Sequence, residues 1–357
     1  MKALILAGGK GTRLRPLTYT AAKQLIPIAN KPTIQYGIES IIESGITEIG
    51  IIVGDTREEV RSELGDGSRF GVSFTYIVQD EPLGLAHAVL LAEEFMNGDS
   101  FLMYLGDNIV QNGVKTFVDD FKMHQPNAMV LLNPVPNPSS FGVVVLEDDR
   151  VVQLIEKPKD PPTNLALVGV YFFDSTIFTA AKSIQPSKRN ELEITDALQW
   201  LVDHDLLVKP HVIHKWWKDT GKPADMLEAN RMMLENSKEP PQILGEVDDL
   251  SLVTPTVHIE PGARVINSTI RGPAVIGRDA IIENAYVGPF TSLGPKVRLV
   301  DAEIENSIVC EDAVIVNVSD RLDGCLLGRG VSIMSVTSKP KSNSFVLGDN
   351  SSVVFSR

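Results

Sequence analysis

Residues 1–18 read Met-Lys-Ala-Leu-Ile-Leu-Ala-Gly-Gly-Lys-Gly-Thr-Arg-Leu-Arg-Pro-Leu-Thr, a short apolar run followed at once by a glycine-rich, basic loop. Three glycines and three cations make up this loop: Gly8, Gly9, Gly11, Lys10, Arg13 and Arg15. The glycines allow the main chain to turn sharply and to bring its N–H groups against an anion, and the cations compensate the anion's charge. The stretch is typical of a strand that ends in a phosphate-binding loop, and it indicates a nucleoside triphosphate as ligand.

The charge distribution supports a small anionic ligand. The chain has 33 basic and 46 acidic residues, a net charge of −13, yet six Lys or Arg precede its first acidic residue, Glu39. A strongly acidic protein repels nucleic acid and anionic membranes, so neither is an expected partner. A basic loop that is merely solvated is the alternative, and the adjacent glycines argue against it.

Length and composition set the broad class. The chain has 357 residues, of which 43% are hydrophobic, enough for two domains with ordinary cores. Its apolar start is too short for a signal peptide, and no stretch reaches the length of a membrane span. We therefore expect a cytoplasmic protein, with Cys310 and Cys325 as buried thiols instead of a disulfide or a zinc site.

Apolar β-branched runs alternate with amphipathic stretches through the first 238 residues, which predicts a Rossmann-like α/β domain with a mostly parallel sheet. The expected strands cover 3–6, 49–53, 74–78, 101–105, 129–132, 143–146, 151–155 and 168–173. The expected helices cover 32–43, 57–64, 85–95, 114–124, 191–202 and 224–236.

An internal repeat replaces this pattern in residues 239–357. Apolar residues recur every 17 positions, beginning hexapeptides at Ile259, Ile276, Leu293, Cys310 and Leu327. Each is followed four positions later by a small or branched residue: Ala263, Ala280, Val297, Val314 and Val331. Such a repeat buries its apolar residues only by stacking one coil on the next. It resembles the left-handed parallel β-helix of hexapeptide-repeat proteins, here followed by a C-terminal tail.

Both halves together resemble the sugar-nucleotidyltransferase family, and within it the long form of the glucose-1-phosphate thymidylyltransferases. The resemblance covers the full length. Its motifs are residues 6–18, Lys-Gln-Leu-Ile-Pro at 23–27, Leu-Gly-Asp-Asn at 105–108, Glu-Lys-Pro at 156–158, Glu-Leu-Glu-Ile-Thr-Asp at 191–196 and Trp-Lys-Asp-Thr-Gly at 217–221. The implied reaction is attack of the glucose 1-phosphate oxygen on the α-phosphorus of dTTP, which gives dTDP-glucose and pyrophosphate.

The resemblance also assigns the catalytic groups. Arg13 would hold the triphosphate, and Lys23 would reach phosphate near the reacting centre. Asp107 and Asp219 would bind Mg²⁺, the expected cofactor, with phosphate oxygens and water completing its shell. These four residues are the predicted catalytic set.

The nucleotide site implied by the resemblance lies in the glycine-rich loop and in residues 79–85. Its predicted members are Leu6, Ala7, Gly8, Gly9, Gly11, Thr12, Arg13, Gln79, Pro82, Gly84 and Asp107. The Gln79 amide can offer a donor and an acceptor to a pyrimidine. His87 stands where some short-form relatives have glutamine, and we interpret it as a structural or supporting residue.

The sugar phosphate is expected at a second group of residues: Gly142, Glu156, Lys157, Val168 and Arg189. Glu156 would accept hydrogen bonds from sugar hydroxyls, and Lys157 and Arg189 would contact the phosphate. Asn190 replaces a glycine usual in the family. Asn tolerates a positive φ better than most residues, so the local fold should survive.

Three other functions remain open at this stage. A pyrophosphorylase of the same fold could use UTP, GTP or ATP in place of dTTP. The repeat could transfer acyl groups, although His258 is the only histidine after residue 214. The chain could also be a non-catalytic regulatory or scaffold protein, although it keeps the full charged set. Stacked coils offer surfaces for subunit packing, so we expect a homo-oligomer.

Overall fold

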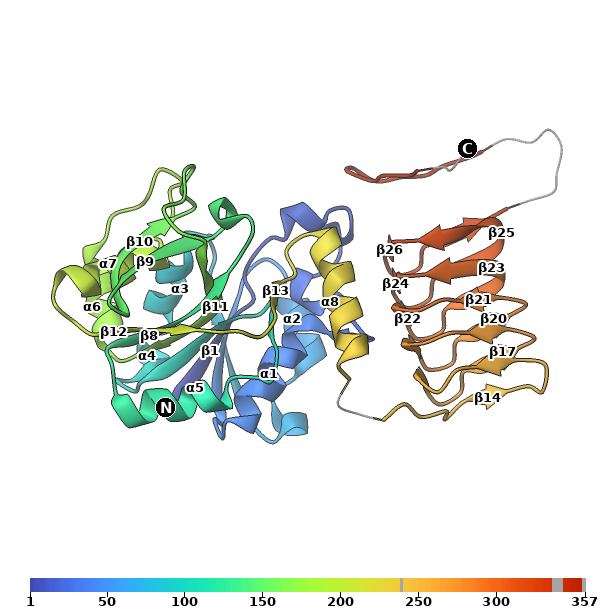
Figure 1. Cartoon of the computed structure of the whole chain (residues 1–357), viewed down its shortest axis with the longest axis horizontal. Helices are drawn as coiled ribbons and strands as arrows, with labels where there is room; N and C mark the ends of the chain where they lie inside the picture. Colours follow the sequence, from blue (N-terminus) through green and yellow to red (C-terminus); the bar gives the residue numbers. More distant parts are fainter. Residues whose placement is uncertain (238–239, 336–342, 355–357) are drawn as a thin grey trace. The chain divides into compact units, whose positions relative to one another are not determined.

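The computed structural model describes residues 1–237, 240–335 and 343–354. The chain divides into two compact units, the first formed by Met1–Lys10 and Ile34–Asp219 and the second by Gly11–Thr33 and Thr220–Arg357 (Figure 1). The predicted domain boundary between residues 238 and 239 lies outside the described residues. No helix among the described residues is long and apolar enough to cross a membrane.

The first unit is built on a nine-stranded sheet. Its strands are β1 (Lys2–Leu6), β4 (Glu48–Val53), β5 (Ser73–Val78), β6 (Phe101–Leu105), β8 (Ala128–Pro134), β9 (Gly142–Glu147), β10 (Arg150–Glu156), β11 (Leu165–Phe173) and β12 (Val208–Val212). They run in the order β10-β9-β11-β6-β1-β4-β5, with β8 pairing β11 and β12. All eight predicted strands are present, and β12 is one that the sequence analysis missed.

The two halves of this sheet differ in strand direction. β5, β4, β1 and β6 are mutually parallel, as expected of a Rossmann-like fold. β11 runs antiparallel to β6, β8 and β9, and β9 runs antiparallel to β10. The parallel strands are therefore concentrated in the half of the sheet that contains β1. The carboxyl ends of β1, β4 and β6 lie along one edge of that half.

Helices cover both faces of the sheet (Figure 1). They are α1 (Thr33–Glu43), α2 (Arg57–Leu64), α3 (Leu85–Leu91), α4 (Glu93–Met96), α5 (Lys115–His124), α6 (Thr176–Ser183) and α7 (Ile194–Asp203). The sequence predicted one helix over 85–95, but the chain turns at Ala92, whose N–H bonds to Leu90 and Val89 oxygens. The sequence analysis also missed α6.

Alternation along the central strands explains the two covered faces, because successive side chains of a strand point to opposite sides. Phe101 and Phe173 share a core cluster with buried residues of α3, α6 and α7. Tyr104 of β6 and Phe172 of β11 face the other side of the sheet. There Tyr104 lies against Gly37 of α1, and Phe172 stacks on Phe121 of α5 with 5.6 Å between ring centroids. A strand buried on both faces needs apolar residues throughout, which is the pattern of 101–105 and 168–173.

The second unit contains a β-helix whose strands all pair in parallel. Its strands are β14 (Glu246–Val247), β15 (Leu252–Val253), β16 (Val257–Ile259), β17 (Arg264–Ile266), β18 (Thr269–Ile270), β19 (Ala274–Ile276), β20 (Ile281–Glu283), β21 (Tyr286–Val287), β22 (Thr291–Leu293), β23 (Arg298–Glu305), β24 (Ile308–Val309), β25 (Val314–Asp323), β26 (Leu326–Leu327) and β27 (Ser332–Met334). The stacked coils in Figure 1 confirm the predicted solenoid architecture. The same unit holds α8 (Pro223–Glu235) and the short hairpin of β2 (Pro27–Ile28) and β3 (Lys31–Pro32).

The predicted 17-residue register holds for the first coils and then shifts. Ile259 pairs with Ile276, and Ile276 pairs with Leu293, as predicted. Leu293 then pairs with Val309, and Val309 pairs with Leu327, so the prediction for Cys310 was wrong by one residue. One coil is a residue shorter and the next a residue longer, which places Val309 in the apolar core of the solenoid.

The solenoid core supplies a stability prediction. Leu293 is fully buried, so we expect Leu293→Ala to lower the free energy of unfolding by about 2–5 kcal/mol, through lost burial and an unfilled cavity. Leu252→Ala, at a side chain that is 59% exposed, is the matched control and should change stability by under about 0.5 kcal/mol. Thermal and denaturant unfolding of the full chain measure both. Equal effects would contradict the assigned register.

Candidate active site

Two aspartates that are far apart in sequence come together at the end of β6. The chain leaves β6 at Leu105, and the Gly106 N–H bonds to the Leu6 oxygen at 3.0 Å, so Asp107 lies beside the end of β1. β7 (Asn108–Val110) follows and pairs antiparallel with β13 (Trp217–Asp219), with Asp219 opposite Asn108. The structure thus brings Asp107 within one residue of the register partner of Asp219.

Asn108 fixes the surroundings of Asp107. The Trp217 indole N–H donates to Asn108 Oδ1, which turns the Asn108 amide nitrogen toward Asp107, and Nδ2 donates to Asp107 Oδ1 at 3.0 Å. An indole N–H can only donate, so this chain of hydrogen bonds has one direction. Both Asp107 and Asn108 are buried. The carboxylate is held in place before any ligand arrives.

The predicted base-binding loop begins where β5 ends. The Gln79 N–H bonds to the Val53 oxygen at 2.8 Å, which continues the β4–β5 ladder, and the Gln79 side chain is buried. Gln79 Nε2 donates to the Gly84 oxygen at 3.3 Å and lies 3.0 Å from His87 Nδ1. Its Oε1 lies beside Gly8, 3.3 Å from where a Cβ on that glycine would stand. Gln79, Gly84 and Gly8 are therefore one group in space.

Gly84 joins this loop to the segment before α7. Leu192 N–H bonds to the Leu83 oxygen at 2.7 Å, and Ala86 N–H bonds to the Leu192 oxygen at 3.1 Å. Gly84 has a φ of 107°, and a Cβ there would lie 2.3 Å from the Leu192 oxygen. Only glycine fits this contact. Pro82, by contrast, is exposed on the outer part of the loop.

The predicted sugar-phosphate residues also form one group. Gly142 is the register partner of Glu156 across β9 and β10, and Lys157 Nζ lies 3.1 Å from Glu156 Oε1. Thr195 Oγ1 donates to Glu156 Oε2 at 3.4 Å. Val168 is buried in β11, two residues beyond Ala166, which pairs with β9. Gly142, Lys157 and Thr195 therefore lie around Glu156, and their binding of a sugar phosphate stays a prediction.

Arg189 is surrounded by carboxylates. Its Nη2 lies 2.8 Å from Glu193 Oε2, 2.9 Å from Glu191 Oε2 and 3.5 Å from Glu156 Oε1. The hydrogen bonds to Glu193 raise the pKa of Arg189, so the guanidinium stays charged. Its charge is already compensated, and its role as a phosphate ligand stays a prediction. Asn190 has a φ of 60°, the left-handed conformation that its replacement of glycine implied.

Asp196 adds a further acidic group beside this site. Burial raises its pKa, and the neighbouring charges of Glu193 and Glu156 raise it further. Two or more carboxylates that share a partly buried space disfavour one another's ionisation. The cluster around Arg189 therefore holds more negative than positive charge, and Lys157 is a second cation bound to it.

Arg13 and Lys23, the two cations of the predicted catalytic set, belong to the second unit. Gly11, with a φ of 61°, precedes a short 3₁₀ turn over Thr12–Leu14, and Leu14 N–H bonds to its oxygen at 2.9 Å. A Cβ on Gly11 would lie 2.9 Å from the Lys23 Cβ. The loop thus folds back so that the stem of Lys23 lies against Gly11, two residues from the exposed Arg13.

The sequence analysis gave no role to three further residues of its motifs, two in the first unit and one in the second. Asn108 and Trp217 stand inside quoted motifs, but only strand pairing shows that they hold Asp107. Gln24, also inside a motif, is buried, and its Oε1 has no hydrogen-bond partner among the described residues. A buried acceptor of this kind normally has a donor, which marks Gln24 as a candidate ligand contact.

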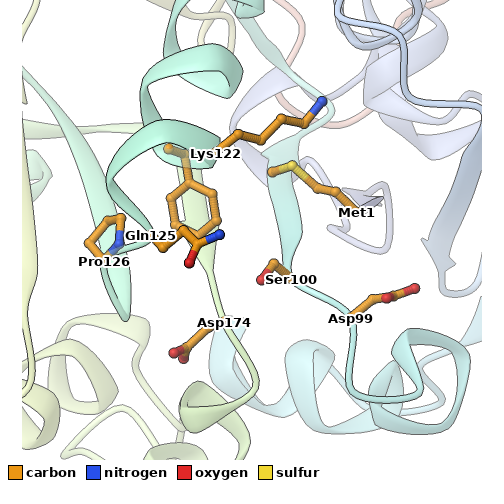
Figure 2. Close-up of a pocket in the computed structure, with 8 residues that line it drawn as sticks. Met1, Asp99, Ser100, Lys122, Gln125, Pro126 and Asp174 are labelled. Carbon is orange, nitrogen blue, oxygen red and sulfur yellow. The ribbon is translucent and has the colours of Figure 1, made fainter.

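A cavity of about 480 Å³ lies elsewhere, at the opposite edge of the sheet. Met1, Ser100 and Pro126 line it, and each stands just before a strand begins (Figure 2). Ligands of open parallel sheets bind at the carboxyl ends of strands. The cavity is therefore separate from the residues described above.

The model of one protein family, nucleotidyl transferase, matches residues 2–236. This match includes Asp107, Asp219, the glycine-rich loop and residues 79–85. The chain belongs to the nucleotidyl transferase family. The predicted nucleotidyltransferase fold and family are thereby confirmed.

Curated relatives of this nucleotidyl transferase extend the similarity over the solenoid. It is 50% identical over 355 residues to a glucose-1-phosphate thymidylyltransferase of Streptomyces antibioticus, covering 99% of each chain. It is 46% identical to the low-salt glycan biosynthesis nucleotidyltransferase Agl11 of Haloferax volcanii, covering 98% of this chain and 99% of the relative. A Bacillus anthracis protein described as a glucose-1-phosphate thymidylyltransferase and solved with sucrose is 38% identical, with a TM-score of 0.62, over 65% of this chain and 94% of its own.

Proposed function

We propose that this nucleotidyl transferase moves a thymidylyl group from dTTP to glucose 1-phosphate, which yields dTDP-glucose and pyrophosphate. The observation that carries the proposal is the β7–β13 pairing, which brings Asp107 next to the Asp219 strand at the carboxyl end of β6. The full-length similarity to thymidylyltransferases supports the choice of substrates.

The proposed roles follow from charge and position. Arg13 is exposed on the loop after the glycines, so its planar guanidinium can bind two phosphate oxygens at once. Lys23 supplies a second cation close to that loop. Glu156 and Lys157 hold the sugar phosphate, so its oxygen approaches the α-phosphorus opposite the departing pyrophosphate. Catalysis then consists of positioning two anions and neutralising their charge.

Asp107 and Asp219 are the proposed Mg²⁺ ligands. Carboxylate oxygens suit this hard cation, and one or two of them are enough when substrate phosphates and waters complete the octahedron. No group of three or more His, Cys, Asp or Glu side chains that could hold a metal occurs in the described part of the chain. When bound, Mg²⁺ would neutralise charge on the triphosphate.

Initial rates of pyrophosphate release with glucose 1-phosphate and Mg²⁺ test the proposal. We expect dTTP to be used faster than UTP, GTP or ATP, and release to stop when EDTA removes the metal. A UDP-glucose pyrophosphorylase solved with UDP-glucose is 28% identical with a TM-score of 0.59, which makes UTP the second candidate. A preference for UTP would replace dTTP in the proposal, and no release with any of the four would overturn it.

Trp217→Phe tests the hydrogen bonds that hold Asp107. Phenylalanine keeps an aromatic ring near Phe141 but removes the N–H that donates to Asn108. We expect kcat to fall about tenfold and the Mg²⁺ concentration for half-maximal rate to rise. The reason is that an Asn108 amide without its Trp217 partner no longer orients the Asp107 carboxylate. Trp200→Phe on α7, whose ring stacks on His204, is the control. An unchanged kcat for Trp217→Phe would contradict this role.

A cytoplasmic location and a homo-oligomeric state remain part of the proposal. Size-exclusion chromatography with light scattering measures the latter. Acyl transfer by the solenoid has less support, because His258 Nδ1 already accepts a hydrogen bond from the Gln242 N–H at 3.2 Å.

A further inference from the structure

We propose that His87 is a positioning residue that fixes the Gln79 amide so that only its oxygen faces the nucleotide. The site thereby selects bases whose edge offers an N–H donor, such as N3–H of thymine or uracil, over cytosine, whose N3 is an acceptor. This inference rests on the proposed function. It assigns a cause of base selection to a residue that does not itself contact the base.

The orientation of the Gln79 amide follows from the nature of its partners. The Gly84 carbonyl oxygen can only accept, so the amide atom that faces it at 3.3 Å is the NH₂ nitrogen. The same nitrogen lies 3.0 Å from His87 Nδ1. Since Nε2 is purely a donor, Nδ1 must accept, and the His87 proton is therefore on Nε2. Both amide hydrogens of Gln79 are then committed within the protein.

Gln79 Oε1 is the atom left for a ligand. It lies beside Gly8, at the start of the glycine-rich loop, in a side chain that is only 8% exposed. A buried acceptor that meets a second acceptor loses its hydrogen bond and is desolvated without compensation. Thymine and uracil present N3–H to such an oxygen, whereas cytosine presents a lone pair. The sequence alone suggested that this amide could act as donor and acceptor, and the structure leaves only the acceptor.

The backbone that carries His87 is anchored on both sides. It is in the first turn of α3, whose start is anchored by the Ala86 N–H bond to the Leu192 oxygen. Ala86, Ala88 and Val89 around it are buried in the core of the sheet. Without the Nδ1 acceptor, the longer bond to Gly84 remains of the two hydrogen bonds described for this nitrogen. A 180° flip of the amide then becomes easier, and a flipped amide would offer N–H to cytosine N3.

The ratio of kcat/KM for dTTP to that for dCTP tests the inference, measured with glucose 1-phosphate and Mg²⁺. We expect His87→Leu to lower this ratio at least about fivefold, mainly by raising KM for dTTP, while kcat stays within about twofold. His87→Gln should keep the ratio, because its Oε1 can accept the same hydrogen bond. Leu91→Ala, at a 38% exposed position on the same helix, is the matched control.

Thermal unfolding checks that each variant is folded, and His87→Met replaces the leucine variant if that one is not. An unchanged ratio in a folded His87→Leu or His87→Met enzyme would overturn the inference. So would an equal loss with dTTP and dCTP, since that is the result of a purely structural role. A wild-type enzyme that turns over no nucleotide at all would instead overturn the proposed function, so the two failures are distinguishable.

Discussion

Asp107→Asn is expected to lower the rate of pyrophosphate release by about 10³-fold, the largest effect of any single substitution in the site. The side chain keeps its size and can still meet Asn108, so the fold should persist. The change removes a negative charge that is buried at the end of β6, and with it the preferred oxygen ligand for Mg²⁺. The rate at saturating dTTP and glucose 1-phosphate, measured across a Mg²⁺ titration, provides the test.

Asp219→Asn should act on the same step. Because Asp107 and Asp219 are proposed to serve one ion, the double variant should be little slower than the slower single variant. Asp119→Asn is the matched control, since Asp119 is half-exposed on α5 and forms an i,i+4 ion pair with Lys115. If folded Asp107→Asn enzyme kept more than about a tenth of wild-type activity, the metal-centred mechanism would be wrong.

Gly84→Ala is expected to lower the free energy of unfolding by about 3 kcal/mol or more and to abolish activity as well. The added Cβ would lie 2.3 Å from the Leu192 oxygen, and both contacting groups are backbone that cannot rotate away. The φ of 107° adds strain of its own. Relief requires the loop with Gln79 and the segment with Arg189 to separate, which disturbs the base site and the sugar site together.

Gly98→Ala is the control that separates the backbone strain of a positive φ from the steric clash with Leu192. Gly98 has a φ of 80°, yet no heavy atom of the described residues lies within 4 Å of a Cβ built there. We expect this control to cost only about 1–2 kcal/mol, from the left-handed conformation alone, and to leave kcat unchanged. Thermal unfolding and initial rates measure both variants. The same fall in melting temperature for the two would show that the contact with Leu192 is not tight.

Local sequence predicted most of the elements because their signals are local. The run Phe101–Leu105 is apolar on both faces and is a central strand, and the hexapeptide spacing gave the coils of the solenoid. Two details of the elements were not predicted by these local signals. The solenoid register shifted at Cys310 because one coil lost a residue, which no periodic pattern can reveal. The predicted 85–95 helix is interrupted at Ala92, a buried residue with high helix propensity, so local propensity did not reveal the break.

The candidate site divides in the same way. Residue types by themselves predicted a glycine-rich, basic loop suited to phosphate, because glycine and arginine have chemistry that does not depend on distant neighbours. The order of the motifs carried the resemblance to the sugar-nucleotidyltransferases, and with it the expected fold. Only the tertiary structure decided that β13 pairs with β7 beside Asp107, that Arg189 lies among three carboxylates, and that His87 holds Gln79. Those facts depend on strand pairing and loop contacts between residues that are distant in sequence, or on the direction of a single hydrogen bond. Neither is encoded in any one stretch of the chain.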